Sequence, residues 1–158
     1  MPTPEFILAL REKVGSTRLW LSGATAVVVR EGGDGTEVLL VRRADNGEWT
    51  PVAGIVDPGE QPHDTAVREV AEEAGVGVEV ERLVWLTVTE VITYANGDET
   101  QYIDHVFRCR WTSGDPHPVD GEATEAAFFP AGQLPSMSPR HTEQVRVALE
   151  NRPEARLG

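Results

Sequence analysis

Three glutamates between residues 54 and 76 (GIVDPGEQPHDTAVREVAEEAGV) have the residue type and spacing needed for phosphate chemistry. Glu69, Glu72 and Glu73 stand at i, i+3 and i+4, so on an α-helix they share one face. Like charges at this spacing destabilise a helix by roughly 0.2–0.5 kcal/mol, so a partner of opposite charge is expected. Mg²⁺ takes oxygen ligands and commonly binds one or two carboxylates together with substrate phosphates. The spacing therefore predicts a divalent-cation site.

The charge balance restricts the classes of partner. The chain carries 26 acidic against 14 basic residues, a net charge of −12. Duplex nucleic acid is recognised by basic surfaces, and no basic footprint is visible, so such a partner is not expected. An anionic small molecule would need a cation to screen the acidic residues, which again favours metal-assisted chemistry.

Length and composition indicate one soluble domain over residues 1–158. The 158 residues are enough for one sizeable core but short for two. No apolar run approaches the roughly 20 residues that span a bilayer, so no membrane association is expected. The first fifteen residues mix charges into their apolar stretch, unlike a signal peptide. A single cysteine, Cys109, suits a reducing cytoplasm.

The first half of the chain reads as a helix, a hairpin and a short strand. Capping chemistry predicts a helix over residues 1–16, with Thr3 before it and Gly15 at its stop. Runs rich in β-branched residues at 19–30 and 37–43 flank the turn sequence EGGDGT, which predicts a β-hairpin. Residues 47–54 are expected to form one short strand.

Residues 63–74 predict a helix that stops at Gly75, with a loop on either side. Its acidic face, with Arg68, is expected to point away from the core. The opposite face is expected to be buried by Ala66, Val67, Val70, Ala71 and Ala74.

The second half reads as a hairpin, a strand and a helix. Runs at 78–94 and 99–111 flank Ala95-Asn96-Gly97-Asp98, and Asn-Gly between apolar runs is a strong hairpin signal. A strand at 123–129 and a helix at 138–151 follow. The whole is a mixed α/β domain.

Residues 54–76 resemble the signature box of the Nudix hydrolases in all seven fixed positions and both aliphatic positions. The resemblance implies the family's α/β/α sandwich, with a mixed central sheet and the box as loop, helix and loop. It also implies hydrolysis of a nucleoside diphosphate linked to another moiety, with Mg²⁺ or Mn²⁺ as cofactor and a small nucleotide as substrate.

Matching positions give the roles that the resemblance implies. Glu69 and Glu73 are similar to the main metal ligands, with Glu72 assisting and the carbonyl of Gly54 joining them. Arg68 is similar to the residue that orients the box glutamates. By the same resemblance, Glu60 would support the site from the loop. Ala53 replaces a glycine that many members have, which narrows the backbone conformations available beside Gly54.

A general base must lie within reach of the attacking water. In this family the base comes from the box or from a later loop. The later candidates are Glu122 and Glu125, and we favour Glu122 because it lies closer to the loop.

Four residues outside the box are candidates for contact with substrate. Arg42 and Arg43 end a strand near the expected cleft, and a guanidinium suits phosphate recognition. Trp49 and Tyr102 could stack on a base, although packing is an alternative for both. In YIDHVF, alternation allows at most one of Asp104 and His105 to face the cleft.

Several functions stay open at this point. A nucleotide sugar such as ADP-ribose is the first substrate hypothesis, and a (deoxy)nucleoside triphosphate is the second. An isopentenyl-diphosphate isomerase on the same fold would need a catalytic cysteine, for which only Cys109 is available. A non-catalytic nucleotide-binding module is another class, although such relatives typically lose box glutamates and this chain keeps all of them. Phe6 and Ile7, expected to be exposed on the first helix, could serve a homodimer.

Overall fold

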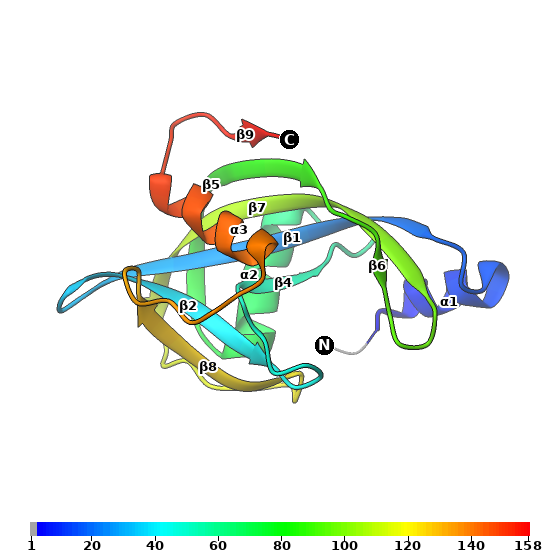
Figure 1. The fold of residues 1–158 in the computed structure, drawn as a ribbon, viewed down its shortest axis with the longest axis horizontal. Helices are drawn as coiled ribbons and strands as arrows, with labels where there is room; N and C mark the ends of the chain where they lie inside the picture. The colour runs from blue at the N-terminus through cyan, green and yellow to red at the C-terminus, as the bar shows by residue number, and fades with distance from the viewer. Residues whose placement is uncertain (1–2) are drawn as a thin grey trace.

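A mixed β-sheet forms the centre of the computed structural model, which describes residues 3–158 (Figure 1). The three helices are α1 (Glu5–Val14), α2 (Pro62–Ala74) and α3 (Pro139–Glu150). The strands are β1 (Leu19–Gly32), β2 (Gly35–Arg43), β3 (Trp49–Thr50), β4 (Val52–Ile55), β5 (Gly77–Val88), β6 (Ile92–Thr93), β7 (Glu99–Ser113), β8 (Ala123–Pro130) and β9 (Arg156–Leu157).

Strands β1 and β7 run parallel through the middle of the sheet, with Leu19 opposite Thr100 and Val29 opposite Arg110. Strand β2 pairs with β1 and β5 pairs with β7, both antiparallel, so the two expected hairpin pairings are confirmed. Strand β4 also pairs antiparallel with β1, on the edge of β1 opposite to β7, with Ala24 opposite Gly54. This pairing places the first residue of the box beside the central strand.

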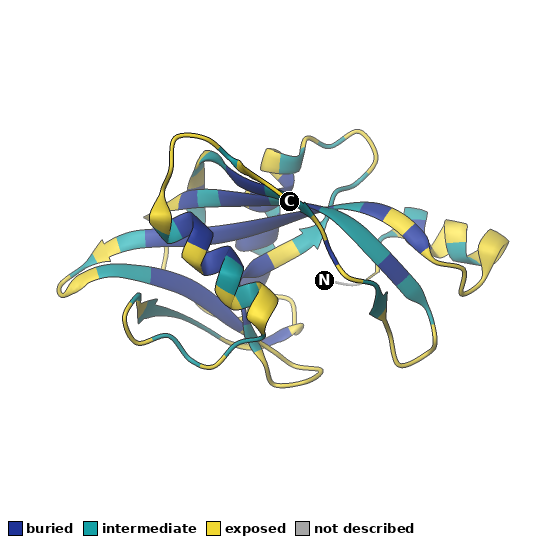
Figure 2. Cartoon of the chain, turned by 45° about the horizontal axis from the view of Figure 1, so that its top comes forward, coloured by how far each residue is buried: buried dark blue, intermediate teal, exposed yellow. Residues whose placement is uncertain are grey.

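The two faces of the sheet carry separate cores. Alternation along β1 sends Ala24, Ala26 and Val28 to the face covered by α2. It sends Val27 and Val29 to the face covered by α3. Figure 2 shows the buried residues following the middle strands and exposed residues on the outer sides of the helices. The α/β/α sandwich with a mixed central sheet is therefore confirmed.

Two expected strands are broken. Residues 47–54 divide at Pro51, which has no N–H for a ladder, into β3 on β2 and β4 on β1. Residues 78–94 divide into β5 and the short β6, and the Asn96-Gly97 turn joins β6 to β7. Strand β9, which pairs with β5, was not expected from the sequence.

Helix α1 and the hairpin of β6 with β7 lie together at one end of the molecule, on the right in Figure 1. Ile7 is buried there with Leu19 and Leu21, and Phe6 and Tyr102 pack against them. The expectation that Ile7 is exposed was therefore wrong, because this small cluster within the chain takes up its side chain.

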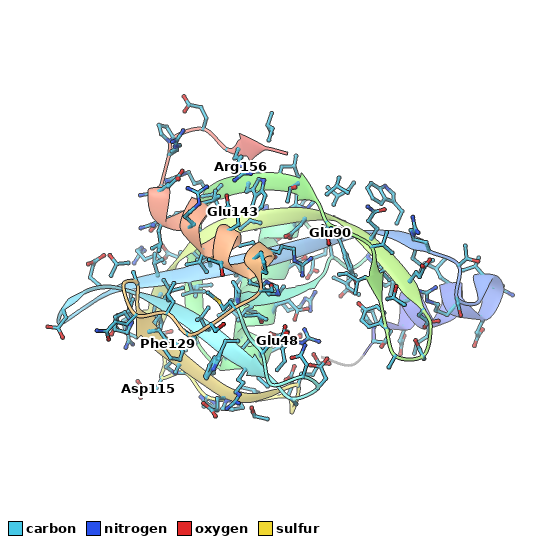
Figure 3. All side chains as sticks on the ribbon, in the orientation of Figure 1. Glu48, Glu90, Asp115, Phe129, Glu143 and Arg156 are labelled. Carbon is cyan, nitrogen blue, oxygen red and sulfur yellow. The ribbon has the colours of Figure 1, made fainter. Side chains whose placement is uncertain are left out.

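An ion pair between Glu143 and Arg156, both labelled in Figure 3, connects helix α3 to strand β9.

Within residues 3–158, no helix has the length and apolar character needed to cross a lipid bilayer.

The burial of helix α2 differs from the expectation in two ways. Val67 and Ala71 are exposed, whereas Ala66, Val70 and Ala74 are buried, so the apolar stripe is narrower than expected. Glu69 and Glu73 are buried rather than turned to solvent. Gly75 ends the helix as expected, in the left-handed conformation (φ 68°) that suits glycine.

The two valines of α2 provide a matched test of this packing. Val70 has no exposed surface and Val67 is 37% exposed. We expect Val70→Ala to lower the free energy of unfolding by about 2 kcal/mol, since two buried methyl groups are lost. Val67→Ala should change it by less than about 0.5 kcal/mol. Denaturant unfolding measures both, and equal losses would contradict the assigned helix face.

Candidate active site

A cleft of about 450 Å³ opens between helix α1, the central strands and the N-terminal end of helix α3. This volume is in the range of small-ligand sites. Its lining includes side chains from five places distant in sequence. They are Arg43 at the end of β2, Glu69 and Glu73 on α2, Tyr102 and Asp104 on β7, and Glu122, Arg140 and His141.

Glu69 and Glu73 are the acidic floor of the cleft. Glu69 has no exposed surface and Glu73 is 9% exposed. Burial raises the pKa of both carboxyl groups, and the charge of Glu69 raises the pKa of Glu73 further. Carboxylates placed in this way are costly to keep charged without a cation.

Gly54 leaves the space that Glu69 occupies. A Cβ atom added at Gly54 would lie 2.1 Å from Cδ of Glu69, which is far inside van der Waals contact. The first residue of the box is therefore glycine because a buried glutamate crosses its backbone. The neighbouring Ala53 sits exposed in an ordinary antiparallel pair with Thr25, so the alanine fits this strand without strain.

Arg68 holds one oxygen of Glu69 in place. Its guanidinium donates to both oxygens of Glu60, at 2.8 Å each, and to Oε1 of Glu69 at 2.9 Å. It also reaches Oε2 of Glu72 at 3.3 Å. These hydrogen bonds raise the pKa of Arg68, first through Glu60, and lower the pKa of Glu60 to about 2. Arg68 thus links the loop to the helix.

The other oxygen of Glu69 fits a cation. Oε2 is buried and has no hydrogen-bond partner within the described residues. An unpartnered buried carboxylate oxygen is rare, and a hard divalent cation is the ligand that would satisfy it. Glu73 lines the same cleft, as does Gly54. Across residues 3–158, no three Asp, Glu, His or Cys side chains are already gathered at cation-binding distance.

Glu72 is placed differently from the other two box glutamates. It is absent from the described lining of the cleft and lines a second hollow with Asp57. Its carboxylate is turned toward Arg68. The structure therefore brings together Glu69 and Glu73 but not all three.

Of the four residues expected to contact substrate, two line the cleft and two do not. Arg43 and Tyr102 line the cleft. Arg42 points elsewhere, with its guanidinium on the carbonyl of Gly47 and on Glu125, its cross-strand partner on β8. Trp49 does not line the cleft: it packs edge-on against Phe129, with ring centroids 4.9 Å apart, in the core on the α3 side of the sheet.

The two candidates for the general base are also separated. Glu122 lies at the end of the loop before β8 and lines the cleft. Glu125 sits on β8, exposed, in its pair with Arg42. Of the two, only Glu122 belongs to the described lining of the cleft.

A buried polar group in the cleft wall was missed by the sequence reasoning. Asp104, Thr25 and Gln144 are all buried and hydrogen-bonded to one another, and His141 adjoins them. Alternation on β7 did allow one of Asp104 and His105 to face the cleft, and Asp104 is that residue. The sequence signal was a charged residue inside an otherwise buried strand.

Comparison with known proteins gives the family of the chain. A model of the NUDIX domain matches residues 21–150. The chain is 36% identical over 125 residues to a MutT-like protein of Streptomyces ambofaciens, covering 78% of this chain and 70% of that protein. It is 31% identical over 135 residues to the NAD-capped RNA hydrolase NudC of Deinococcus radiodurans, covering 82% of this chain but 45% of that protein.

The crystal structure of an ADP-ribose pyrophosphatase from Streptococcus suis superposes with a TM-score of 0.65 at 25% identity, covering 87% of this chain and 98% of that one. The chain belongs to the Nudix hydrolase family, and it is a Nudix-type pyrophosphohydrolase. Members of this family act on small nucleotides and generally use a divalent metal.

The ion pair between Arg68 and Glu60 predicts a pH-dependent stability. A carboxyl whose pKa is lowered on folding stabilises the fold above its unfolded pKa, near 4.5, and that contribution is lost as the pH falls toward about 2. We expect Glu60→Gln to lower the free energy of unfolding by about 1–3 kcal/mol at neutral pH. The deficit should shrink steadily between pH 5 and pH 2. A deficit independent of pH, measured by urea unfolding, would contradict the assignment.

The contact between Gly54 and Glu69 predicts a specific sensitivity to size. Gly54→Ala adds a methyl group where Cδ of Glu69 lies, so we expect the carboxylate to be displaced and Mg²⁺ affinity to fall by roughly 10- to 100-fold. The matched control is Gly33→Ala, in the turn between β1 and β2, because nothing lies within 4 Å of a Cβ atom added there. Calorimetric Mg²⁺ titration checks both, and equal affinity of Gly54→Ala and wild type would refute the role of this glycine.

Proposed function

We propose that this chain hydrolyses a phosphoanhydride bond in a nucleoside diphosphate linked to another moiety, with Mg²⁺ as cofactor and Mn²⁺ as a substitute. ADP-ribose is the first substrate to test. The observation that carries the proposal is the buried pair Glu69 and Glu73, with an unpartnered oxygen of Glu69 in the cleft. Two desolvated carboxylates suit a divalent cation and would repel a bare phosphate.

Metal binding, orientation and proton transfer would each be carried out by different residues. Glu69, Glu73 and the Gly54 carbonyl would hold the cation, while Arg68 fixes the carboxylate of Glu69. When bound, Mg²⁺ neutralises phosphate oxygens and makes water a stronger nucleophile. Glu122 would accept a proton from the attacking water.

Arg43 is suited to a phosphate oxygen at the side of the cleft. Two of its nitrogens donate to Asp45, at 2.9 and 2.6 Å, and this pairing raises the pKa of Arg43. A guanidinium held in this way keeps its charge and has a further N–H group to offer. We therefore assign Arg43, rather than Arg42, to the substrate.

The cleft has room for groups on both sides of the phosphates. Toward helix α1 it is lined by Ile7, Leu21, Tyr94 and Tyr102, and the two tyrosine hydroxyls lie 3.1 Å apart. Burial raises the pKa of Tyr102, so its hydroxyl is neutral. An apolar wall with aromatic rings suits a nucleobase. The basic end near Arg43 and Arg140 suits the second, phosphate-bearing half.

Product analysis with Mg²⁺ tests the substrate class. ADP-ribose is expected to give AMP and ribose 5-phosphate. A (deoxy)nucleoside triphosphate as the true substrate would instead give a monophosphate and pyrophosphate. Absence of turnover with nucleotide sugars, dinucleoside polyphosphates and triphosphates alike would reject the proposal and favour a non-catalytic binding module.

Substitution of the acidic residues tests their roles. We expect Glu69→Gln and Glu73→Gln each to lower kcat by roughly 100-fold or more, because each removes a charge that holds the cation. Glu122→Gln should lower kcat by a similar factor and leave Mg²⁺ affinity nearly unchanged, since a general base acts on the water.

Glu125→Gln is the matched control for Glu122→Gln, because Glu125 lies nearby on β8 but outside the cleft. Initial rates at saturating Mg²⁺ give kcat for all four variants. Full activity in Glu69→Gln would overturn the catalytic assignment of the box, and equal losses in Glu122→Gln and Glu125→Gln would overturn the choice of base.

A further inference from the structure

A chain of buried hydrogen bonds crosses from the central strands to helix α3 beneath the cleft. Thr25 donates to Oδ1 of Asp104 at 2.9 Å, and Nε2 of Gln144 donates to Oδ2 of Asp104 at 2.9 Å. Oε1 of Gln144 then lies 3.0 Å from Nδ1 of His141. Asp104 is 5% and Gln144 is 1% exposed, so both side chains are almost completely shielded from water.

The donor and acceptor capacities of these side chains fix the direction of each hydrogen bond. A carboxylate only accepts hydrogen bonds, so Gln144 must turn its NH₂ group to Asp104. The amide oxygen of Gln144 therefore faces His141, and an oxygen in that position only accepts. Nδ1 of His141 must carry the proton, which leaves Nε2 as the unprotonated nitrogen of a neutral ring.

The surroundings of His141 keep the ring neutral. Burial lowers the pKa of His141, and the nearby charges of Arg140 and Arg43 lower it further against the opposing effects of Gln144 and Glu48. The ring lines the cleft, and Nε2 makes no hydrogen bond to the other described residues. The ring nitrogen Nε2 is thus an acceptor in the cleft lining, whereas Arg43 and Arg140, which also line the cleft, can only donate.

We propose that Nε2 of His141 accepts a hydrogen bond from a hydroxyl or N–H group of the nucleotide in the cleft, and that Asp104 positions this acceptor by fixing the tautomer through Gln144. The identity of the ligand rests on the proposed function, whereas the tautomer does not. His141 is then a substrate-binding residue, and Asp104 and Gln144 are positioning residues that need not touch the substrate.

The tautomer can be measured without ligand or turnover. Long-range ¹H–¹⁵N correlation spectra of the metal-free protein report which ring nitrogen is protonated, and His141→Asn assigns the signals. We expect the Nδ1–H form at neutral pH. In Asp104→Asn the new side chain can donate as well as accept, so Gln144 can turn and a population with Nε2–H should appear. Protonation of Nε2 in the wild-type protein would overturn the proposal.

The contact with ligand is tested with two non-reacting halves of the proposed substrate. These are adenosine 5′-(α,β-methylene)diphosphate and ribose 5-phosphate, each titrated in the presence of Mg²⁺. We expect one of them to move the ¹⁵N resonance of Nε2, and the responding half identifies which moiety carries the donor. Saturation by both probes with no movement of this resonance would refute the contact.

Two substitutions separate binding from structural support. Asn at position 141 can keep the hydrogen bond to Gln144 but has no acceptor where Nε2 lies, whereas Gln at 141 can place its amide oxygen there. We expect His141→Asn to lower the affinity for the responding half by about 3- to 10-fold, which corresponds to the loss of one neutral hydrogen bond. His141→Gln should restore most of this loss.

The control is His63→Asn, because His63 lies on α2 with its side chain 57% exposed. Equal losses in His141→Asn and His141→Gln, with wild-type stability in both, would overturn the acceptor role. Failure of the wild-type protein to bind either half would overturn the ligand class and count against the proposed function, while the tautomer measurement would still stand.

Discussion

Burial of two neighbouring carboxylates is the constraint on which the rest of this site depends. Glu69 and Glu73 lie one helical turn apart on α2, almost without exposed surface, and desolvation raises the pKa of both. Such a pair opposes folding unless protons or a cation neutralise it. The surrounding sequence is explained by this constraint. Glycine at position 54 makes the space for Glu69, and Arg68 anchors one oxygen of the pair while the other is left for a ligand.

The sandwich supplies the geometry for this arrangement. Strand β4 pairs with β1 and brings Gly54 under α2, while the parallel pairing of β1 with β7 brings Thr25 and Asp104 to the same region. Helix α3, packed on the opposite face, adds His141 and Gln144 at the cleft wall. One cleft thus combines an acidic floor on α2, a basic side from β2 and α3, and an apolar end from α1, β1 and β7.

Local chemistry made the elements and the box predictable, because helix caps, the Asn96-Gly97 turn and the spacing of Glu69 and Glu73 act within a few residues. The direction of single side chains was not predictable in the same way. The helix period alone puts Glu72 with the other two glutamates, but its carboxylate lies against Arg68 and outside the described lining of the cleft. Other features depend on contacts between residues far apart in the sequence. They are the burial of Glu69, the split of the strand at Pro51, the burial of Ile7 and the buried hydrogen bonds of Asp104.

Proton release on metal binding tests the central claim most directly. Because burial raises the pKa of both Glu69 and Glu73, a cation that binds their carboxylates is expected to release protons as it binds. Calorimetric Mg²⁺ titrations in buffers of different ionisation enthalpy count those protons. The account predicts a net release of protons at pH 7 that is reduced or lost in Glu69→Gln together with affinity. Binding without proton release, unaltered in that variant, would contradict it.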